Sequence, residues 1–159
     1  MTTIDQFLTA DIVTASVSPQ SLIMMLDDPW TPTGVLNTVL RDQNISRVNG
    51  DLLSAFRMRH RLPLEVEDDD VANVRSAITG HAMARFLYYV AQAQLRPDGP
   101  RDQKPAYKDQ FDASEIWLGR IADGRLTMGA AIEPARSDRG DVLSNAPERT
   151  FTRNTMRNL

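Results

Sequence analysis

Apolar residues recur at three- and four-residue intervals along much of this chain, which is the spacing of one buried helical face. The clearest run lies between residues 71 and 93 and is made of Val71, Val74, Ile78, Ala82, Phe86, Tyr89 and Ala93. Met83, Leu87 and Val90 widen that face, which is typical of a central helix in a bundle. The aspartates at 68–70 are expected to supply its N-cap and first-turn negative charge.

Two further runs predict helices on either side of this one. The first covers residues 33–59, with its stripe at Leu36, Val39, Leu40, Val48, Leu52, Ala55 and Phe56. Residues 44–50 weaken its middle, where a kink or break is an open alternative. The second begins near Lys104-Pro105 and ends at Asp123-Gly124, with its stripe at Tyr107, Phe111, Ser114, Leu118 and Ile121, and Trp117 alongside.

The first 26 residues contain two shorter apolar segments. Ile4, Phe7 and Leu8 are expected to form one helical face, and Ser18-Pro19 marks the start of another helix. The pattern therefore predicts an all-α fold, a small bundle of about four main helices. Its core is expected to include Val74, Ile78, Ala82, Phe86, Tyr89, Leu118 and Ile121.

The helical pattern is lost from Gly129 onward. We expect residues 1–129 to form a helical domain and residues 130–159 to form an extended C-terminal arm that orders only on a partner. The last residues combine apolar anchors with basic side chains and read as a docking peptide: Arg149, Phe151, Arg153, Met156, Arg157 and Leu159. A frayed terminus is the alternative explanation of this composition.

Composition restricts the function classes. The formal charge of −3 gives no whole-molecule signal for nucleic-acid binding, and the absence of cysteine excludes disulfides and thiolate metal sites. We expect no membrane association, because the most apolar stretch, residues 77–93, is interrupted by His81 and Arg85. Arginine outnumbers lysine strongly; this fits protein interfaces, and it fits a G- and C-rich genome equally well.

Residues for catalysis are scarce in this sequence. His60 lies among arginines at a helix end, where a solvated or capping role is expected, and His81 is expected to be a hydrogen-bonded core or interface residue. No glycine-rich phosphate loop occurs, and we expect neither an enzyme nor a cofactor. Five carboxylates follow one another closely without the spacing of a calcium loop, and we interpret them as a cap and an acidic patch: Glu65, Glu67, Asp68, Asp69 and Asp70.

Basic residues crowd the end of the second predicted helix. Arg57, Arg59 and Arg61 could bind phosphates, but the carboxylates that follow make partner carboxylates, or simple solvation, at least as plausible. Trp30, between Pro29 and Pro32, is expected at a surface or subunit contact.

Three blocks, in order, resemble the Mu-like bacteriophage head–tail adaptor, or neck, proteins. The first runs from Val48 to Leu64 and ends in an arginine-rich turn and Leu62-Pro63-Leu64. The second is the helix at 74–91 with Tyr107-Lys108-Asp109 after its loop, and the third is 117–129. The ending Arg149-Thr150-Phe151-Thr152-Arg153 is also similar. Residues before Arg41 depart from the family pattern, and residues 40–50 carry an insertion.

The resemblance implies a structural virion protein that forms a homo-oligomeric ring, usually a dodecamer, in the phage neck. Such a ring holds the portal protein through the C-terminal arm and receives a stopper or tail-terminator protein on its other side. Genomic DNA passes through the channel without sequence-specific binding, and Glu65–Asp70 is a candidate lumen- or portal-facing patch. The expected location is the virion, and the host cytoplasm during assembly. A small helical regulatory or DNA-binding module is the alternative.

Overall fold

The computed structural model describes residues 2–4, 6–28, 31–58, 60, 62–66, 68–95, 105–123 and 125–126. Within them the chain is mainly helical, as predicted. The elements in chain order are β1 (Thr2–Ile4), α1 (Ala10–Ser16), α2 (Pro19–Leu26), α3 (Thr38–Phe56), β2 (Leu64–Val66), the 3-10 turn η1 (Asp68–Asp70), α4 (Val71–Ala93) and α5 (Lys108–Ala122).

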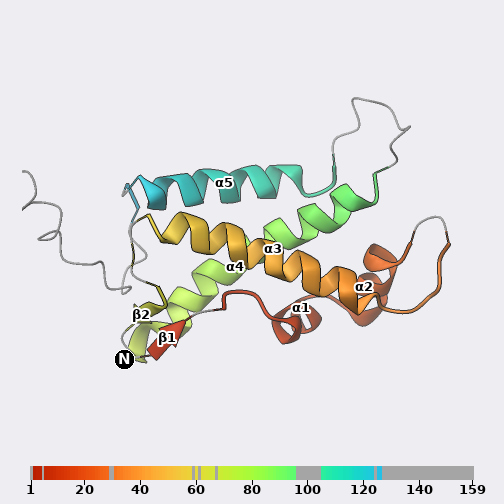
Figure 1. Ribbon diagram of the computed structural model, residues 1–159, viewed down its shortest axis with the longest axis horizontal. Coiled ribbons are helices and arrows are strands. Elements are labelled where there is room, and N and C mark those ends of the chain that lie inside the picture. Colours follow the sequence, from red (N-terminus) through yellow and green to blue (C-terminus); the bar gives the residue numbers. More distant parts are fainter. Residues whose placement is uncertain are drawn as a thin grey trace, which may run out of the picture.

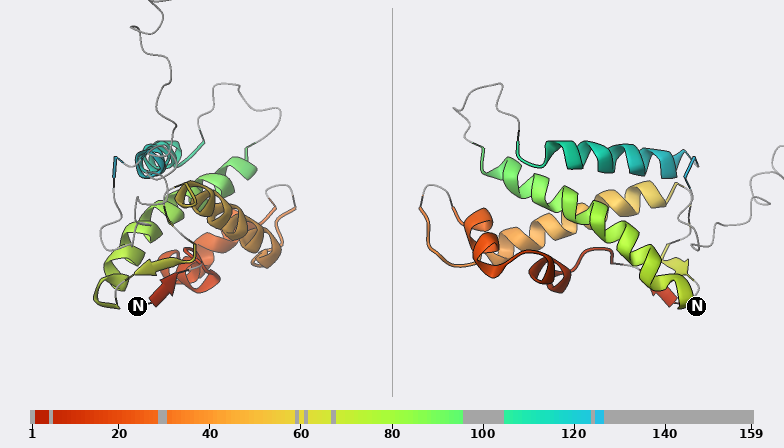
Figure 2. Two further views of the ribbon diagram at one scale, coloured as in Figure 1. Left: turned by 60° about the vertical axis from the view of Figure 1, so that its left-hand side comes forward. Right: turned by 180° about the vertical axis from the view of Figure 1, so that it is seen from behind.

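The three long helices, α3, α4 and α5, pack against one another and form the body of the molecule (Figure 1). α3 and α5 run in the same direction, and α4 runs in the opposite direction and packs against both (Figures 1 and 2). α1 and α2 lie on the side of α3 and α4 away from α5, and the two-stranded sheet lies at one end. This arrangement places the start of α3 and α2 at one end of a long body, and β2, η1 and the start of α4 at the other (Figure 1).

Side-chain caps set where α2 and α3 begin. Ser18 accepts a hydrogen bond from the backbone N–H of Ser21, and Pro19 follows at the first helical position, so the predicted start of α2 is confirmed. α3 begins at Thr38, later than predicted, because Asn37 is its N-cap and accepts from the N–H of Leu40. α5 begins at Lys108 rather than near Pro105, and Tyr107 at its N-cap position makes no side-chain capping bond.

The weak middle of α3 is continuous helix, and its asparagines explain why. Asn44 is buried and donates to the carbonyl of Leu40 in the preceding turn. Asn49 bonds outside the helix: its Oδ1 accepts from the N–H groups of Phe7 and Leu8 at 3.1 and 3.0 Å, and its Nδ2 donates to the carbonyl of Leu8 at 2.8 Å. Asn49 therefore fastens the segment at Phe7 and Leu8 to α3, while Asn44 bonds within the helix.

The helical face predicted for Ile4, Phe7 and Leu8 is wrong. Residues 2–4 form β1, which pairs antiparallel with β2, so that Ile4 faces Leu64 across the ladder. All three predicted residues are nevertheless buried. Three apolar residues within five positions satisfy either conformation, and the pairing with a distant strand decides between them. The short helix α1 that follows was not predicted.

The predicted core residues on α4 and α5 are all buried, which confirms that part of the prediction. Val39 is an exception on α3, since it is 66% exposed. It precedes Val48 by nine residues, which is about two and a half turns at roughly 3.6 residues per turn, so it lies on the opposite side of the helix. Ile45 takes the buried position instead.

Candidate functional site

A buried arginine joins the three long helices at their centre. Arg85 of α4 is 4% exposed. Its Nη2 donates to Oδ2 of Asp51 on α3 at 3.0 Å, and its Nη1 donates to Oε1 of Glu115 on α5. The hydroxyl of Tyr89, one turn further along α4, donates to the same oxygen of Asp51. We call Asp51, Arg85, Tyr89 and Glu115 the Arg85 cluster.

The protonation states of this cluster follow from its contacts. Burial lowers the pKa of Arg85 by itself, but the hydrogen bonds that Arg85 donates to Asp51 and Glu115 outweigh it and raise the pKa above its ordinary value. Burial and the hydrogen bond to Asp51 raise the pKa of the Tyr89 hydroxyl. The guanidinium therefore stays charged and the phenol stays neutral over the whole physiological range, so neither is poised to exchange a proton. The arrangement is chemically a clamp on three helices.

Aromatic rings surround the clamp. The guanidinium of Arg85 lies 4.9 Å from the ring centre of Phe111, and that of Arg47 lies 3.8 Å from the ring centre of Tyr89. Phe111 stacks on Tyr88 at 4.1 Å. These contacts add cation–π attraction to the ion pairs of the clamp.

The cluster forms the polar part of a groove of about 360 Å³ between α3 and α5, which we call the α3–α5 groove. Asp51, Arg85 and Glu115 line it at the polar part. The rest of its lining is small or apolar: Ser54, Ala55, Met58, Leu118, Gly119 and Ala122. Both helices run in the same direction, so Met58 and Ala122 mark one end of the groove and the clamp marks the other.

His81 on α4 and Ser114 on α5 are a histidine and a hydroxyl on neighbouring helices. The ring of His81 stacks on that of Trp117 at 4.1 Å, and burial lowers the pKa of His81 below 6.5. The Ser114 hydroxyl donates to the main-chain oxygen of His81, not to its ring. This pair packs α4 on α5 and is not arranged to activate a hydroxyl.

The solvated or capping role predicted for His60 is wrong, because His60 is buried. Its side chain is 4% exposed, and its ring lies edge-on to that of Phe56 at 6.5 Å. The reason is that α3 ends at Phe56, and the N–H of His60 then bonds the carbonyl of Phe56. This turn brings the imidazole back toward the core. The neighbouring arginines in the sequence had indicated a solvent-exposed position for His60.

The predicted acidic patch is at one end of the molecule. Glu65 lies on β2 and is exposed, as are Asp68 and Asp69, while Asp70 is partly buried. The Thr2 hydroxyl donates to Asp68 at 2.7 Å, which ties the patch to β1. We call Glu65, Asp68, Asp69 and Asp70 the acidic end. Asp70 occupies the N-cap position of α4 but makes no side-chain capping bond, so the predicted cap is wrong in that respect.

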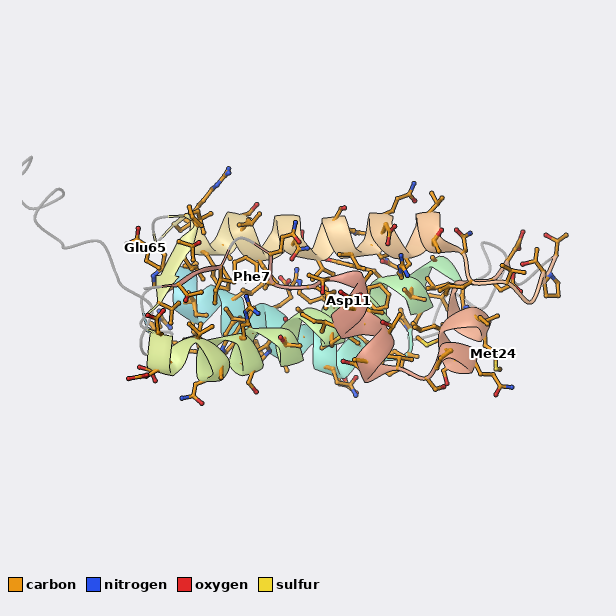
Figure 3. All side chains as sticks on the ribbon, turned by 90° about the horizontal axis from the view of Figure 1, so that it is seen from below. Phe7, Asp11, Met24 and Glu65 are labelled. Atoms are coloured by element: carbon orange, nitrogen blue, oxygen red, sulfur yellow. The ribbon has the colours of Figure 1, made fainter. Side chains whose placement is uncertain are left out.

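Three large apolar side chains are exposed at the opposite end of the molecule. Met24 of α2, Val35 of the loop before α3, and Val39 are 74%, 66% and 66% exposed. We call these three residues the apolar end. Figure 3 shows Met24 and Glu65 at opposite ends of the long axis, with Asp11 between them. The molecule therefore offers two chemically different terminal surfaces.

The other predicted site residues are only partly placed. Arg57 is exposed at the C-cap of α3, at the same end as the acidic residues. Several predicted residues lie outside the described part of the chain: Trp30, Arg59, Arg61, Glu67, Arg149, Phe151, Arg153, Met156, Arg157 and Leu159. The Arg85 cluster was missed, although an arginine interrupting the most apolar helix was its visible signal in the sequence.

The described residues show neither a metal-binding group nor a membrane-spanning helix. Among the described residues, no three or more histidine, aspartate or glutamate side chains are grouped as metal ligands would be. In the same residues no helix combines the length and apolarity that crossing a bilayer requires. Comparison with protein-family models and with curated proteins finds no match for this chain.

Proposed function

We propose that this chain is a subunit of the adaptor ring in a bacteriophage neck, joining the portal to the stopper or tail and lining part of the DNA channel. The observation that carries the proposal is the elongated body with an acidic end and an apolar end. A connector subunit must meet different neighbours at its two ends, and rotation of identical wedges closes a ring through contacts between unlike surfaces.

The placement of the family-like blocks supports this proposal. The first block covers the second half of α3 and the connection into β2, the second covers most of α4 and the start of α5, and the third begins on the last turns of α5. The resemblance therefore falls on the three helices that pack against one another. Residues before Arg41, where the resemblance fails, belong to the outer elements and the start of α3.

The acidic end suits a channel that DNA must traverse without binding. Glu65, Asp68 and Asp69 are exposed, and carboxylates repel phosphates at short range. Arg57 at the same end leaves a positive site for a partner carboxylate. In the proposed ring the acidic end faces the lumen or the portal.

Deletion of residues 129–159 tests the proposed portal-binding arm. The helical circular dichroism signal should persist, because the described bundle is complete by Leu126. Heads carrying the portal should fail to join tails, so that filled heads and free tails accumulate separately. Normal joining by the truncated chain would contradict the assignment of the arm.

A DNA-binding module is the second candidate, and α1–α2 is the pair to consider. The two helices are joined by only Val17 and Ser18, as in a helix-turn-helix, but residues 10–26 contain no lysine or arginine. A gel shift on random duplex DNA at increasing salt separates the candidates. Strong binding at physiological salt would favour the DNA-binding module over the adaptor.

A further inference from the structure

The α3–α5 groove is an open surface with a polar part and an apolar part. Met58, at its apolar part, is 64% exposed. Gly119 leaves space in its wall, since a Cβ built there meets no atom within 4 Å. Glu115, at its polar part, gives one oxygen to Arg85 and has a side chain that is 51% exposed. The groove can therefore take one apolar side chain and one additional cation.

Residues 149–159 of the same chain have this chemistry. They contain Arg149, Arg153 and Arg157 and no carboxylate side chain, and their apolar residues include Phe151. The groove side has the opposite sign, because two carboxylates, Asp51 and Glu115, face one guanidinium there. An aromatic ring against methionine sulfur is a favourable contact, and a second guanidinium on Glu115 makes a charge-assisted hydrogen bond.

The path of the chain makes this contact reachable. After α5 the chain turns back, with the N–H of Leu126 bonded to the carbonyl of Arg120, so it leaves the bundle beside Ala122 at the apolar part of the groove. Residues 127–148 separate that point from the segment in the sequence, and a flexible chain of this length spans roughly 26 Å on average. The groove wall from Glu115 to Ala122 is about 10 Å long at roughly 1.5 Å per residue.

We infer that residues 149–159 dock in the α3–α5 groove of their own chain, with Phe151 between Met58 and Gly119 and an arginine on Glu115. A short tether keeps the segment at an effective concentration on the order of millimolar, which favours the same chain over a second copy. This inference does not depend on the phage assignment. If both hold, portal attachment begins with release of the segment from the groove.

Engineered disulfides in the full chain test the contact, since the chain has no cysteine of its own. Ser54→Cys is close to isosteric and sits on the groove, where the native hydroxyl bonds only the Gly50 carbonyl of its own helix. Paired with Thr152→Cys, it should form an intrachain disulfide about tenfold faster than the control pair Val39→Cys with Thr152→Cys. Val39 is exposed on the same helix but at the opposite end.

Gly119→Leu in the cross-linking variant provides the second measurement. Leucine fills the open space at this position and favours the helix over glycine, so the fold is retained while the docking space is lost. In this variant the rate of cross-linking should fall toward the control rate. Glu115→Gln should also lower the rate of cross-linking, and the decrease should be larger at low salt than at high salt. Equal rates for the two cysteine pairs, or disulfide-linked dimers in place of monomers, would overturn the inference. Either result leaves the deletion experiment on head–tail joining unaffected.

Discussion

At the scale of single residues, Arg85 is the most consequential side chain. It is 4% exposed and holds carboxylates from two other helices, Asp51 and Glu115. A buried arginine is stable only where its charge is compensated, so the two carboxylates and the helix positions that carry them depend on it. Its cluster is a constraint on how α3, α4 and α5 fit together.

Arg85→Ala should destabilise the fold by about 3 kcal/mol, at the lower end for breaking a buried ion pair, because both carboxylates can regain water. Arg85→Met keeps most of the side-chain volume and should lose about half as much. Urea denaturation of the two variants measures the difference. Equal losses would show that the ion pairs, and not packing, account for the effect.

Trp117→Ala should destabilise the fold by about 3 kcal/mol, the usual scale for truncating a packed tryptophan. Its ring stacks on His81 at 4.1 Å and lies edge-on to Phe56 at 6.1 Å, so one truncation removes contacts to α3 and α4. Thermal melts measure the loss, with Ile116→Ala on the exposed face of α5 as the control. A loss no larger than the control would contradict the role of Trp117 in the core.

Stability should fall on acidification through the range where His81 titrates. Burial lowers its pKa in the folded state below the ordinary 6.5, so protons bind the unfolded chain more readily. The contribution of neutral His81 is complete above pH 6.5 and declines as the pH falls toward the folded-state pKa. Urea midpoints measured from pH 8 to pH 5 should decline less in His81→Gln. Identical pH profiles of the urea midpoint for the parent chain and His81→Gln would show that His81 does not cause the loss of stability.

At the scale of elements, side chains outside the helices fix how the helices are joined. Asn49 fastens the segment before α1 to α3. Gln94, just after α4, donates to the carbonyl of Met25 at the end of α2. Asp27, just after α2, accepts from the N–H groups of Thr33 and Gly34 at 2.8 and 2.7 Å. Each bond satisfies backbone groups that a helix end or loop would leave open.

Asp27→Ala should loosen the loop before α3 without unfolding the bundle. The backbone hydrogen bonds from Thr33 and Gly34 lower the pKa of Asp27 to about 2. Its contribution is therefore present above the ordinary value of 3.8 and disappears only as the pH falls through about 2. Hydrogen exchange at Thr33 and Gly34 should be slow at pH 4 in the parent chain and fast in the variant. Equal exchange would refute the role of Asp27.

At the scale of the whole molecule, the two ends of the long axis differ in chemistry. Met24, Val35 and Val39 are exposed at one end, and Glu65, Asp68 and Asp69 are exposed at the other. Apolar surface that folding leaves uncovered is typical of a contact with another protein. In the proposed ring, the apolar end is where a neighbouring subunit or neck protein would bind.

Val39→Asp should weaken ring assembly and leave folding stability within about 0.5 kcal/mol, because the side chain is largely exposed. Ile116→Asp is the matched control, since Ile116 is an exposed apolar residue on α5, 58% accessible. Sedimentation of assembled rings measures the effect, and thermal melts check folding. Assembly that Val39→Asp leaves intact would exclude the apolar end from the contact.

The hydrophobic pattern alone was sufficient for the long helices and most of their core, because a helix of about twenty residues repeats its buried face several times and the repeats agree. Short segments offer no such repetition. The strand at residues 2–4 exists because it pairs with residues 64–66, and Val39 is exposed because α3 rotates it away from Val48. The family resemblance rests on the order of three sequence blocks and does not follow from the fold.

Only the tertiary structure brought together the Arg85 cluster. Its members are separated by up to 64 positions along the chain, from Asp51 to Glu115, and no local pattern links them. The same holds for Asn49 and His60, whose sequence neighbours suggested a weak helix and a solvated end. A charged or polar side chain is buried only where distant partners or ring contacts compensate its lost water. Such partners are a property of packing, and periodicity does not encode them.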